Sequence, residues 1–145
     1  MKDQDSRVRE TAEAIFRKSA FVSGLGIRLA DVGSGWCESE LAVAERHLQQ
    51  DGFVHAGVQA TIADHTAGGA AGTLARPGEM VLTVEFKINL LRPAVGERLR
   101  CRAQVLKPGR TIVVAESEVF ASRDGAETLT AKATVTLALV SADRG

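Results

Sequence analysis

Residues 53–73, FVHAGVQATIADHTAGGAAGT, decide how this 145-residue chain folds. From Ala56 to Ala75 only Asp64 and His65 are ionisable, and most of the other residues are small or apolar. A helix of this composition has almost no polar face for solvent, so it should be buried. The stretch therefore predicts a buried central helix that carries one carboxylate.

Strand-like alternation follows this helix. Residues 1–20 are expected to form an N-terminal helix, and two short strands are expected before the central helix. After it, four segments alternate without another helix, and residues 140–145 are expected to form a tail. The apolar positions expected to share one face of these strands are Leu82, Val84, Phe86, Ile88 and Leu90, then Leu99, Cys101, Ala103 and Val105, then Val113, Ala115 and Val119, then Leu129, Ala131, Ala133, Val135, Leu137 and Leu139.

Four consecutive antiparallel strands can share one apolar face, and another element must cover that face. The buried helix is the expected cover. The sequence therefore predicts an α+β hotdog fold, in which a long central helix is wrapped by a curved antiparallel β-sheet, as a single domain over residues 1–145.

The composition narrows the class of protein. Lys plus Arg and Asp plus Glu are 18 each, so there is no net charge to favour nucleic-acid or membrane-surface binding. The N-terminus has no apolar signal-peptide core, and no apolar run is long enough to span a bilayer. Cys37 and Cys101 lack metal-ligand spacing, and no HExxH or CxxC motif predicts a metal. Two reduced, partly buried thiols fit a cytoplasmic enzyme.

Asp64 is the reactive group of the central helix. Gly57, Thr61, Asp64 and Gly68 are three or four residues apart, so they fall on one face, where small neighbours allow a ligand to approach. A buried carboxylate is costly unless it is paired, which makes Asp64 a candidate base or nucleophile. The alternative is that Asp64 caps a break in the helix or reaches solvent at a subunit edge.

The start of the helix offers backbone donors. His55, Ala56 and Gly57 would present free N–H groups and the positive end of the helix dipole to a thioester or ester carbonyl. Alternatively, Gly57 only allows a tight turn. His55 is a candidate acid or a residue that orders the loop, and His65 is rotated by about 100° from Asp64, which favours a structural or interface role.

A basic region follows the third strand. Glu97 is the only acidic residue among Arg92, Arg98, Arg100, Arg102, Lys107 and Arg110. Arginines bind phosphates in a bidentate manner, so this region could contact a nucleotide-containing substrate. The alternative is a solvated strand face.

The chain resembles the PaaI-like hotdog-fold acyl-CoA thioesterases. HAGVQATIAD (55–64) is similar to their helix entry, with His55 and Gly57 in place and Asp64 at the position of the catalytic acid. FKINLLRPAVGE (86–97) and VLKPGRTIVVAESEVF (105–120) resemble the strand-and-turn segment and the hairpin that follow. The resemblance covers nearly the whole chain after about residue 20.

The resemblance implies hydrolysis of an acyl-CoA thioester to the free acid and CoA, without a separate cofactor. Asp64 would act as general base or nucleophile, and the N–H of Ala56 or Gly57 would form the oxyanion hole. Gln49 lies nearest a family Asn that positions the thioester or water, and Thr83 matches a hydroxyl that positions the water. The residues assigned to the CoA phosphates are Arg92, Lys107 and Arg110.

The resemblance also implies a site shared between subunits. Asp64 stands about two turns from its own helix start, too far for both to act on one carbonyl, so the site should need two copies of the chain in a homodimer that pairs into a homotetramer. Two other functions stay open. One is an enoyl-thioester hydratase or dehydratase with His55 as the acid–base partner, and the other is a non-catalytic acyl-CoA-binding protein.

Overall fold

The structure is a computed structural model that describes residues 2–143. Three α-helices, one short 3₁₀-helix and six strands make up this part of the chain. Their bounds are α1 (Lys2–Lys18), α2 (Ala20–Leu25), β1 (Arg28–Gly33), β2 (Trp36–Ala42), η1 (Glu45–His47), α3 (Ala56–Gly72), β3 (Glu79–Leu90), β4 (Arg98–Pro108), β5 (Ile112–Arg123) and β6 (Ala126–Ser141).

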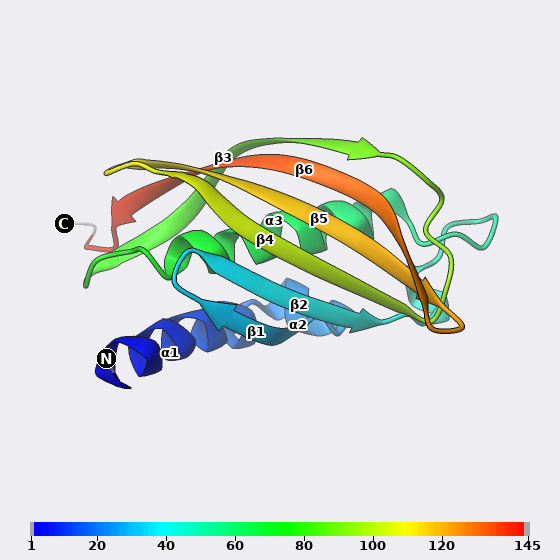
Figure 1. The fold of residues 1–145 in the computed structure, drawn as a ribbon, viewed down its shortest axis with the longest axis horizontal. Coiled ribbons are helices and arrows are strands. Elements are labelled where there is room, and N and C mark those ends of the chain that lie inside the picture. Colours follow the sequence, from blue (N-terminus) through cyan, green and yellow to red (C-terminus); the bar gives the residue numbers. More distant parts are fainter. Residues whose placement is uncertain (1, 144–145) are drawn as a thin grey trace.

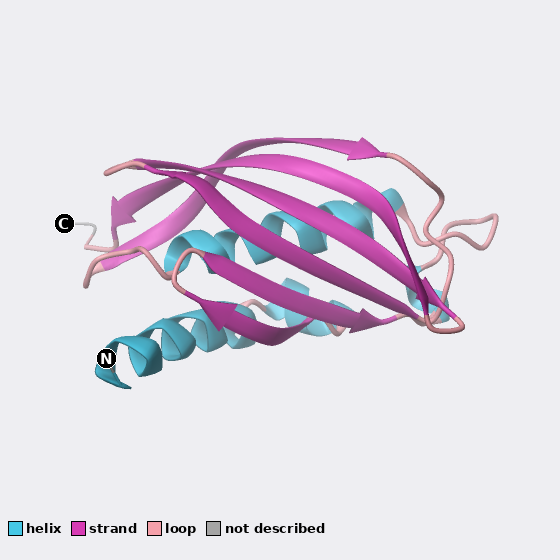
Figure 2. Cartoon of the chain, in the orientation of Figure 1, coloured by secondary structure: helices cyan, strands magenta, loops and turns pink. Residues whose placement is uncertain are grey.

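The six strands form one antiparallel sheet in the order β1-β2-β4-β5-β6-β3. The sheet curves around α3, which lies along its inner face, and α1 packs outside against α3 and β1 (Figures 1 and 2). The expected hotdog fold, a central helix wrapped by a curved antiparallel sheet, is confirmed. Among residues 2–143 no helix is both long and apolar enough to cross a bilayer.

Glycines in α3 allow its neighbours to approach closely. A Cβ atom at Gly69 would lie 2.9 Å from Cys37 Sγ of β2, and one at Gly72 would lie 2.5 Å from Ile15 Cδ1 of α1. Both distances are too short for a real side chain, so β2 and α1 pack here only because the helix carries no side chain. The repeated small residues of the central stretch thus set how tightly the sheet and α1 enclose the helix.

Buried hydroxyl groups attach α3 to the sheet. Ser117 Oγ on β5 donates to the carbonyl of Ala63 at 2.7 Å, and Ser39 Oγ on β2 lies 2.6 Å from Thr66 Oγ1. These serines and threonines are fully buried, so their bonds to the helix satisfy groups that would otherwise be costly to bury. They fix the rotation of α3 beneath the sheet.

A β-bulge in β3 changes which side chains face the helix. Thr83 pairs with Leu137 and Glu85 with Thr136, so Val84 is the extra residue. The inner face of β3 therefore carries Val81 and Thr83 before the bulge and Phe86, Ile88 and Leu90 after it. The expected strict alternation is wrong for Leu82, which lies on the outer face, because a bulge shifts the phase of the side chains by one residue.

A second bulge lies in β6. Val119 pairs with Ala131 and Phe120 with Leu129, so Thr130 is the extra residue and is fully buried. The same phase shift places Leu129 on the outer face, opposite to the expectation. The other expected inward positions of β4, β5 and β6 are buried or half-buried as predicted.

The element ends differ slightly from the sequence prediction. The N-terminal helix expected over residues 1–20 ends at Lys18, and Ser19 caps the separate short helix α2 by accepting from Val22 N. β6 continues to Ser141, two residues into the expected tail. Residues 144–145 of that tail lie outside the described residues.

Candidate active site

One face of α3 is less buried than the rest of the helix. Gly57 is exposed, and Thr61, Asp64 and Gly68 are half-buried, whereas most other positions from Val58 onward are buried. The prediction of a buried helix is correct except on this face, which lies near the sheet edge between α1 and β3. The four residues predicted to share one face of the helix do share its less buried face, and two of them, Asp64 and Gly68, line a cleft.

Asp64 is hydrogen-bonded to Thr83 across the cleft between α3 and β3. Thr83 Oγ1 donates to Asp64 Oδ1 at 2.7 Å, and the bulge at Val84 lets Thr83 face inward together with Phe86. A hydroxyl bonded to a carboxylate makes a strong, charge-assisted hydrogen bond. Among residues 2–143 no other hydrogen bond or ion pair engages this carboxylate, so Asp64 Oδ2 is available to a ligand.

A cleft of about 450 Å³ opens beside this pair. We call it the Asp64 cleft, and it is lined by Thr11, Ala14, Ile15, Asp64, His65, Gly68, Gly72, Ala75, Glu79, Met80, Val81 and Thr83. Most of these side chains are apolar or absent, and α1 supplies one wall. An apolar group attached to a carbonyl near Asp64 would therefore find a pocket of suitable chemistry.

His65 belongs to the wall between α1 and α3. Its ring meets Phe16 edge-on, with 4.6 Å between the ring centroids. Burial lowers the pKa of His65 below its usual value, which favours the neutral imidazole. This contact agrees with the structural role expected from the sequence, although His65 also lines the Asp64 cleft.

The start of α3 is capped by His55. His55 Nδ1 accepts a hydrogen bond from the backbone N of Gly57 at 2.8 Å, as the N-cap side chain. Of the two roles considered for His55, the structure shows the one that orders the loop. Gly57 N–H is thereby occupied, whereas no acceptor for the N–H of Ala56 is found within residues 2–143. Ala56 is the free backbone donor at this helix start.

A second cleft, of about 520 Å³, opens at this helix start. We call it the helix-start cleft, and it is lined by Gln49, Gln50, Phe53, Val54, His55, Ala56, Gln59, Leu90, Leu91, Arg92, Pro93 and Ala94. Gln49 lines it, and its side-chain oxygen Oε1 accepts from the backbone N atoms of Asp51 and Phe53. Its side chain thus orders its own loop.

Gln59 is a polar residue of the helix-start cleft that the sequence reasoning did not single out. It is only 3% exposed, and its Oε1 accepts from Thr130 Oγ1 at 2.8 Å. In the sequence, Gln59 stands out only as a single amide side chain in the apolar first turns of the helix. Its partner is 71 residues away in the sequence, and no local pattern could have supplied it.

The two clefts lie on the same helix but apart. Asp64 follows Ala56 by eight residues, which is about 12 Å along the helix axis. A single carbonyl group cannot contact both the Asp64 carboxylate and the Ala56 N–H of one chain. Each chain therefore presents the carboxylate and the free backbone donor in two separate clefts.

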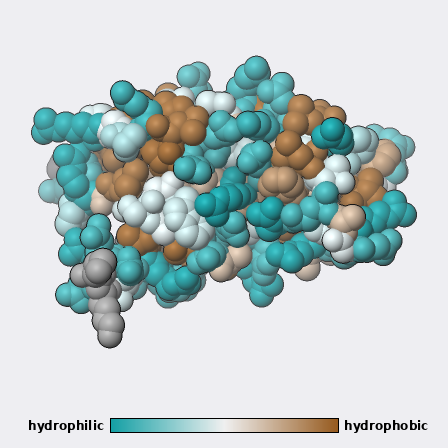
Figure 3. Space-filling view, in the orientation of Figure 1, coloured by the Kyte–Doolittle hydropathy of each residue, from teal (hydrophilic) through white to brown (hydrophobic). Residues whose placement is uncertain are grey.

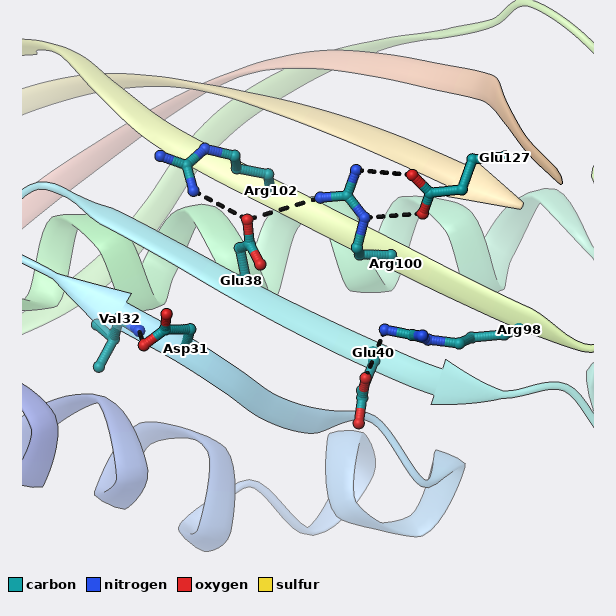
Figure 4. Close-up of polar contacts among 8 residues, drawn as sticks. All are labelled: Asp31, Val32, Glu38, Glu40, Arg98, Arg100, Arg102 and Glu127. Atoms are coloured by element: carbon teal, nitrogen blue, oxygen red, sulfur yellow. Dashed lines mark hydrogen bonds and ion pairs between the residues drawn. The ribbon is translucent and has the colours of Figure 1, made fainter. Parts of the chain in front are cut away.

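The arginines of β4 are paired with acids from other strands of the sheet (Figure 4). The strand carries them on its outer face, and β2 and β6 supply the carboxylates. The pairs are Arg98 with Glu40 at 2.7 Å, Arg100 with Glu127 at 2.8 Å and Arg102 with Glu38 at 2.9 Å. These three residues fit the alternative of a strand face, and the structure adds that their charges are paired with acids.

The three residues assigned to CoA phosphates are not brought together within one chain. Arg92 lines the helix-start cleft, and its backbone N donates to Thr130 O of β6. In the strand register Thr130 lies close to the level of Cys101 on β4. Lys107 lies six residues beyond Cys101 along β4, about 20 Å from it. Arg110 lies beyond Lys107 in the β4–β5 turn. Arg92 and the Lys107–Arg110 pair thus occupy opposite ends of the sheet.

Neither cysteine suits nucleophilic chemistry. Cys37 and Cys101 are buried and unpaired. Burial raises the pKa of Cys101 to about 12 and also raises the pKa of Cys37, so both thiols stay protonated. No group of three or more His, Cys, Asp or Glu side chains in residues 2–143 could hold a metal ion. Asp64 is left as the candidate reactive group.

Comparison with known proteins identifies relatives of the chain. The family model described as thioesterase superfamily matches residues 51–128, which include α3, β3 and most residues of both clefts. A thioesterase family protein from Silicibacter pomeroyi is 39% identical, with a TM-score of 0.88 over 95% of this chain and 98% of that chain. Human acyl-coenzyme A thioesterase 13 is 32% identical over 77% of this chain and 81% of its own length.

The fold is also that of the Escherichia coli PaaI protein from the phenylacetic acid degradation operon, with a TM-score of 0.84 at 20% identity over 94% of this chain and 96% of that chain. At this identity the likeness shows the fold alone. Together with the matching family, it confirms the resemblance seen in the helix-entry motif. The chain belongs to the thioesterase superfamily, as a PaaI-like hotdog protein whose enzyme class is thioester hydrolase.

Proposed function

We propose that this protein hydrolyses acyl-CoA thioesters to the free acid and CoA, with Asp64 as the catalytic carboxylate. The observation that carries the proposal is the Asp64–Thr83 hydrogen bond at the mouth of a largely apolar cleft. With Oδ1 held by Thr83, Oδ2 is free to accept a proton from water or to attack the thioester carbonyl. In either case the C–S bond breaks and CoA leaves as the thiolate; if Asp64 attacks directly, water then hydrolyses the acyl–Asp64 anhydride to give the free acid and restore the carboxylate.

The developing oxyanion would be stabilised at a helix start. The Ala56 N–H is free, and the positive end of the α3 dipole adds to its effect. Because Gly57 N–H is engaged by His55, we assign the oxyanion contact to Ala56 and a supporting role to Gly57 and His55. The distance along α3 requires that this helix start belongs to a second subunit.

An exposed apolar edge supports such a second subunit. β3 is an edge strand, and its exposed apolar side chains include Leu82, Val84, Phe86 and Leu90. Figure 3 shows apolar side chains gathered near the upper edge of the molecule, where Figure 1 draws β3. A long apolar edge strand invites pairing with another chain. We propose a homodimer formed along β3 that pairs further into a homotetramer.

The substrate can be placed from the chemistry of the two clefts. The acyl group would enter the Asp64 cleft, and the thioester would lie between Asp64 of one subunit and Ala56 of its partner. The CoA phosphates would be contacted by Arg92, Lys107 and Arg110. In the assembly these three residues need not belong to one chain. Two buried, unpaired thiols support a cytoplasmic location.

The test is thiol release from a panel of aryl and aliphatic acyl-CoAs by the wild type and by Asp64→Ala. We expect Asp64→Ala to lower kcat by about a thousandfold or more. Asp31→Ala is the matched control, because Asp31 is an exposed carboxylate on β1, at the opposite edge of the sheet. Thiol release at the wild-type rate by Asp64→Ala would refute the proposal.

Two outcomes would replace it by the other functions considered. Tight CoA binding without turnover of any acyl chain would indicate a binding protein. Hydration of an enoyl-CoA without thiol release would indicate a hydratase. His55 is the available acid–base partner for a hydratase, but its Nδ1 caps α3, which favours the hydrolase.

A further inference from the structure

Gln59 carries a buried amide side chain at the edge of the helix-start cleft. It lies one turn after His55 on α3, and its side chain lines the cleft although the residue is only 3% exposed. Burial of an amide is costly unless its polar atoms find partners. The surroundings of Gln59 therefore indicate which of its atoms the protein satisfies and which it leaves for a ligand.

The oxygen of this amide is satisfied by the bulge in β6. Thr130 Oγ1 donates to Gln59 Oε1 at 2.8 Å, and the Thr130 carbonyl accepts from the backbone N of Leu91 at 2.8 Å. One extra residue in β6 thus holds both α3 and the segment after β3, and residues of both line the helix-start cleft. Bulges commonly orient side chains next to functional sites.

The nitrogen of the amide opens on the cleft. Within residues 2–143 no hydrogen bond from Gln59 Nε2 to the protein is found. If this nitrogen were fully enclosed, it would be a buried atom without a partner, but His65 Nε2 is the only such side-chain N or O atom in the described residues. Gln59 Nε2 is therefore reachable from the cleft. A rigidly held amide that points to a cleft is a preorganised hydrogen-bonding group.

We propose that the Gln59 amide hydrogen-bonds the pantetheine arm of CoA, at the amide group nearest the thioester. This inference rests on the proposed function and adds a substrate contact to the helix-start half of the site. The arm carries secondary amides, which are the natural partners of a carboxamide side chain. A thioester without such an amide would not use the contact.

The spacing of the groups agrees with this assignment. Gln59 is three residues beyond Ala56, about 4.5 Å along the helix axis. In the substrate, a sulfur and two methylene groups separate the thioester carbonyl carbon from the nearest amide nitrogen, about 5 Å when extended. A thioester oxygen at the Ala56 N–H therefore brings that amide within reach of Gln59.

The experiment compares Gln59→Met with the wild type on thioesters that carry the same acyl group. The acyl-CoA and the N-acetylcysteamine thioester contain the amide, and the ethanethiol thioester lacks it. We expect Gln59→Met to lower kcat/KM by about 5- to 10-fold on the first two substrates and to leave the third within about twofold. Methionine keeps the length of the side chain, and the single hydrogen of the Thr130 hydroxyl can be donated to Val119 O, 3.2 Å away, instead of to Gln59, so the fold should persist.

The outcomes separate this inference from the proposed function. An equal loss on all three substrates, or no loss on any, would overturn the contact with the arm while the hydrolase activity stands. If the wild type hydrolyses none of them, calorimetric binding of CoA replaces turnover. Weaker binding of CoA by Gln59→Met, with unchanged binding of adenosine 3′,5′-bisphosphate, then supports the contact, and equal CoA binding refutes it.

Discussion

The two clefts on α3 have opposite chemistry. The Asp64 cleft presents a carboxylate oriented by a hydroxyl, whereas the helix-start cleft presents N–H donors at Ala56 and Gln59. Hydrolysis of a thioester needs both, a group that handles a proton and donors for the oxyanion. About 12 Å of helix separates them, so the proposed mechanism needs each chain to contribute its two groups to different sites.

After Asp64→Ala, the largest expected effect is loss of the backbone donor in Ala56→Pro. Ala56 is the first residue of α3, where proline fits a helix, and His55 has φ −59° and ψ 138°, which a following proline accepts. The substitution therefore removes one N–H and little else. We expect kcat to fall about 100- to 1000-fold, with the melting temperature unchanged or higher.

The control is a mixture of two inactive variants. If each site joins Asp64 of one subunit to Ala56 of its partner, a heterodimer of Asp64→Ala and Ala56→Pro keeps one intact site. Random re-pairing of equal amounts should restore about one quarter of wild-type activity. No recovery after confirmed subunit exchange would show that both groups act within one chain, and the comparison of the two halves would fail.

The next largest effect concerns the hydroxyl of the Asp64 cleft. Thr83→Val keeps the shape of the side chain and removes the bond to Asp64 Oδ1. A hydrogen bond to a charged group is worth about 1.5–3 kcal/mol, so kcat should fall about 10- to 100-fold.

Thr83→Ser should retain most of the activity, because a hydroxyl remains. If Thr83→Val and Thr83→Ser are equally impaired, the methyl group rather than the hydroxyl matters. Thr83 would then serve packing, and only the carboxylate would remain as a functional group of this half.

The sequence predicted the layers of the fold because its patterns are local. Clean alternation from Leu99 to Val105 and an apolar helix from Ala56 define the sheet and its cover without knowledge of partners. The bulges at Val84 and Thr130 break that alternation through pairing with other strands. A bulge has no signature in one strand alone, so the inward turn of Thr83 before Phe86 could not be read from strict alternation.

The site was predictable to the same extent. Asp64 and the helix start follow from residue types within one helix, and Thr83 entered only through the family resemblance. The occupation of Gly57 N–H by His55 and the anchoring of Gln59 by Thr130 depend on side-chain conformation and on contacts across the fold. The acids that pair with the β4 arginines come from two distant segments, β2 and β6, which is why a positive region in the sequence is largely neutralised in space.

A smaller effect is expected for the residues assigned to phosphates. Lys107→Ala combined with Arg110→Ala should raise KM for acyl-CoA about 3- to 10-fold, less at high salt because exposed charges are screened. The N-acetylcysteamine thioester has no phosphate, so its KM should not change. Arg98→Ala is the matched control, since Arg98 is paired with Glu40. If the double variant and Arg98→Ala raise KM equally, the effect is general surface charge rather than contact at one end of the sheet.

The smallest expected effect is on the pH dependence of the free energy of unfolding, through the wall of the Asp64 cleft. Burial lowers the pKa of His65 in the Asp64 cleft, so the unfolded chain binds a proton more readily than the folded one. Above the unfolded pKa of about 6.5 both states are neutral and His65 contributes no pH dependence.

As the pH falls below that value, the unfolded state gains the proton first, and the free energy of unfolding should decrease by at most about 1.4 kcal/mol per pH unit until the lowered pKa is reached. Denaturant unfolding between pH 5 and 7 measures this slope. His65→Leu keeps an apolar contact to Phe16 and should flatten it. An unchanged slope in that variant would mean that the imidazole titrates alike in both states, so that the wall between α1 and α3 is open to water, as the helix-start cleft is.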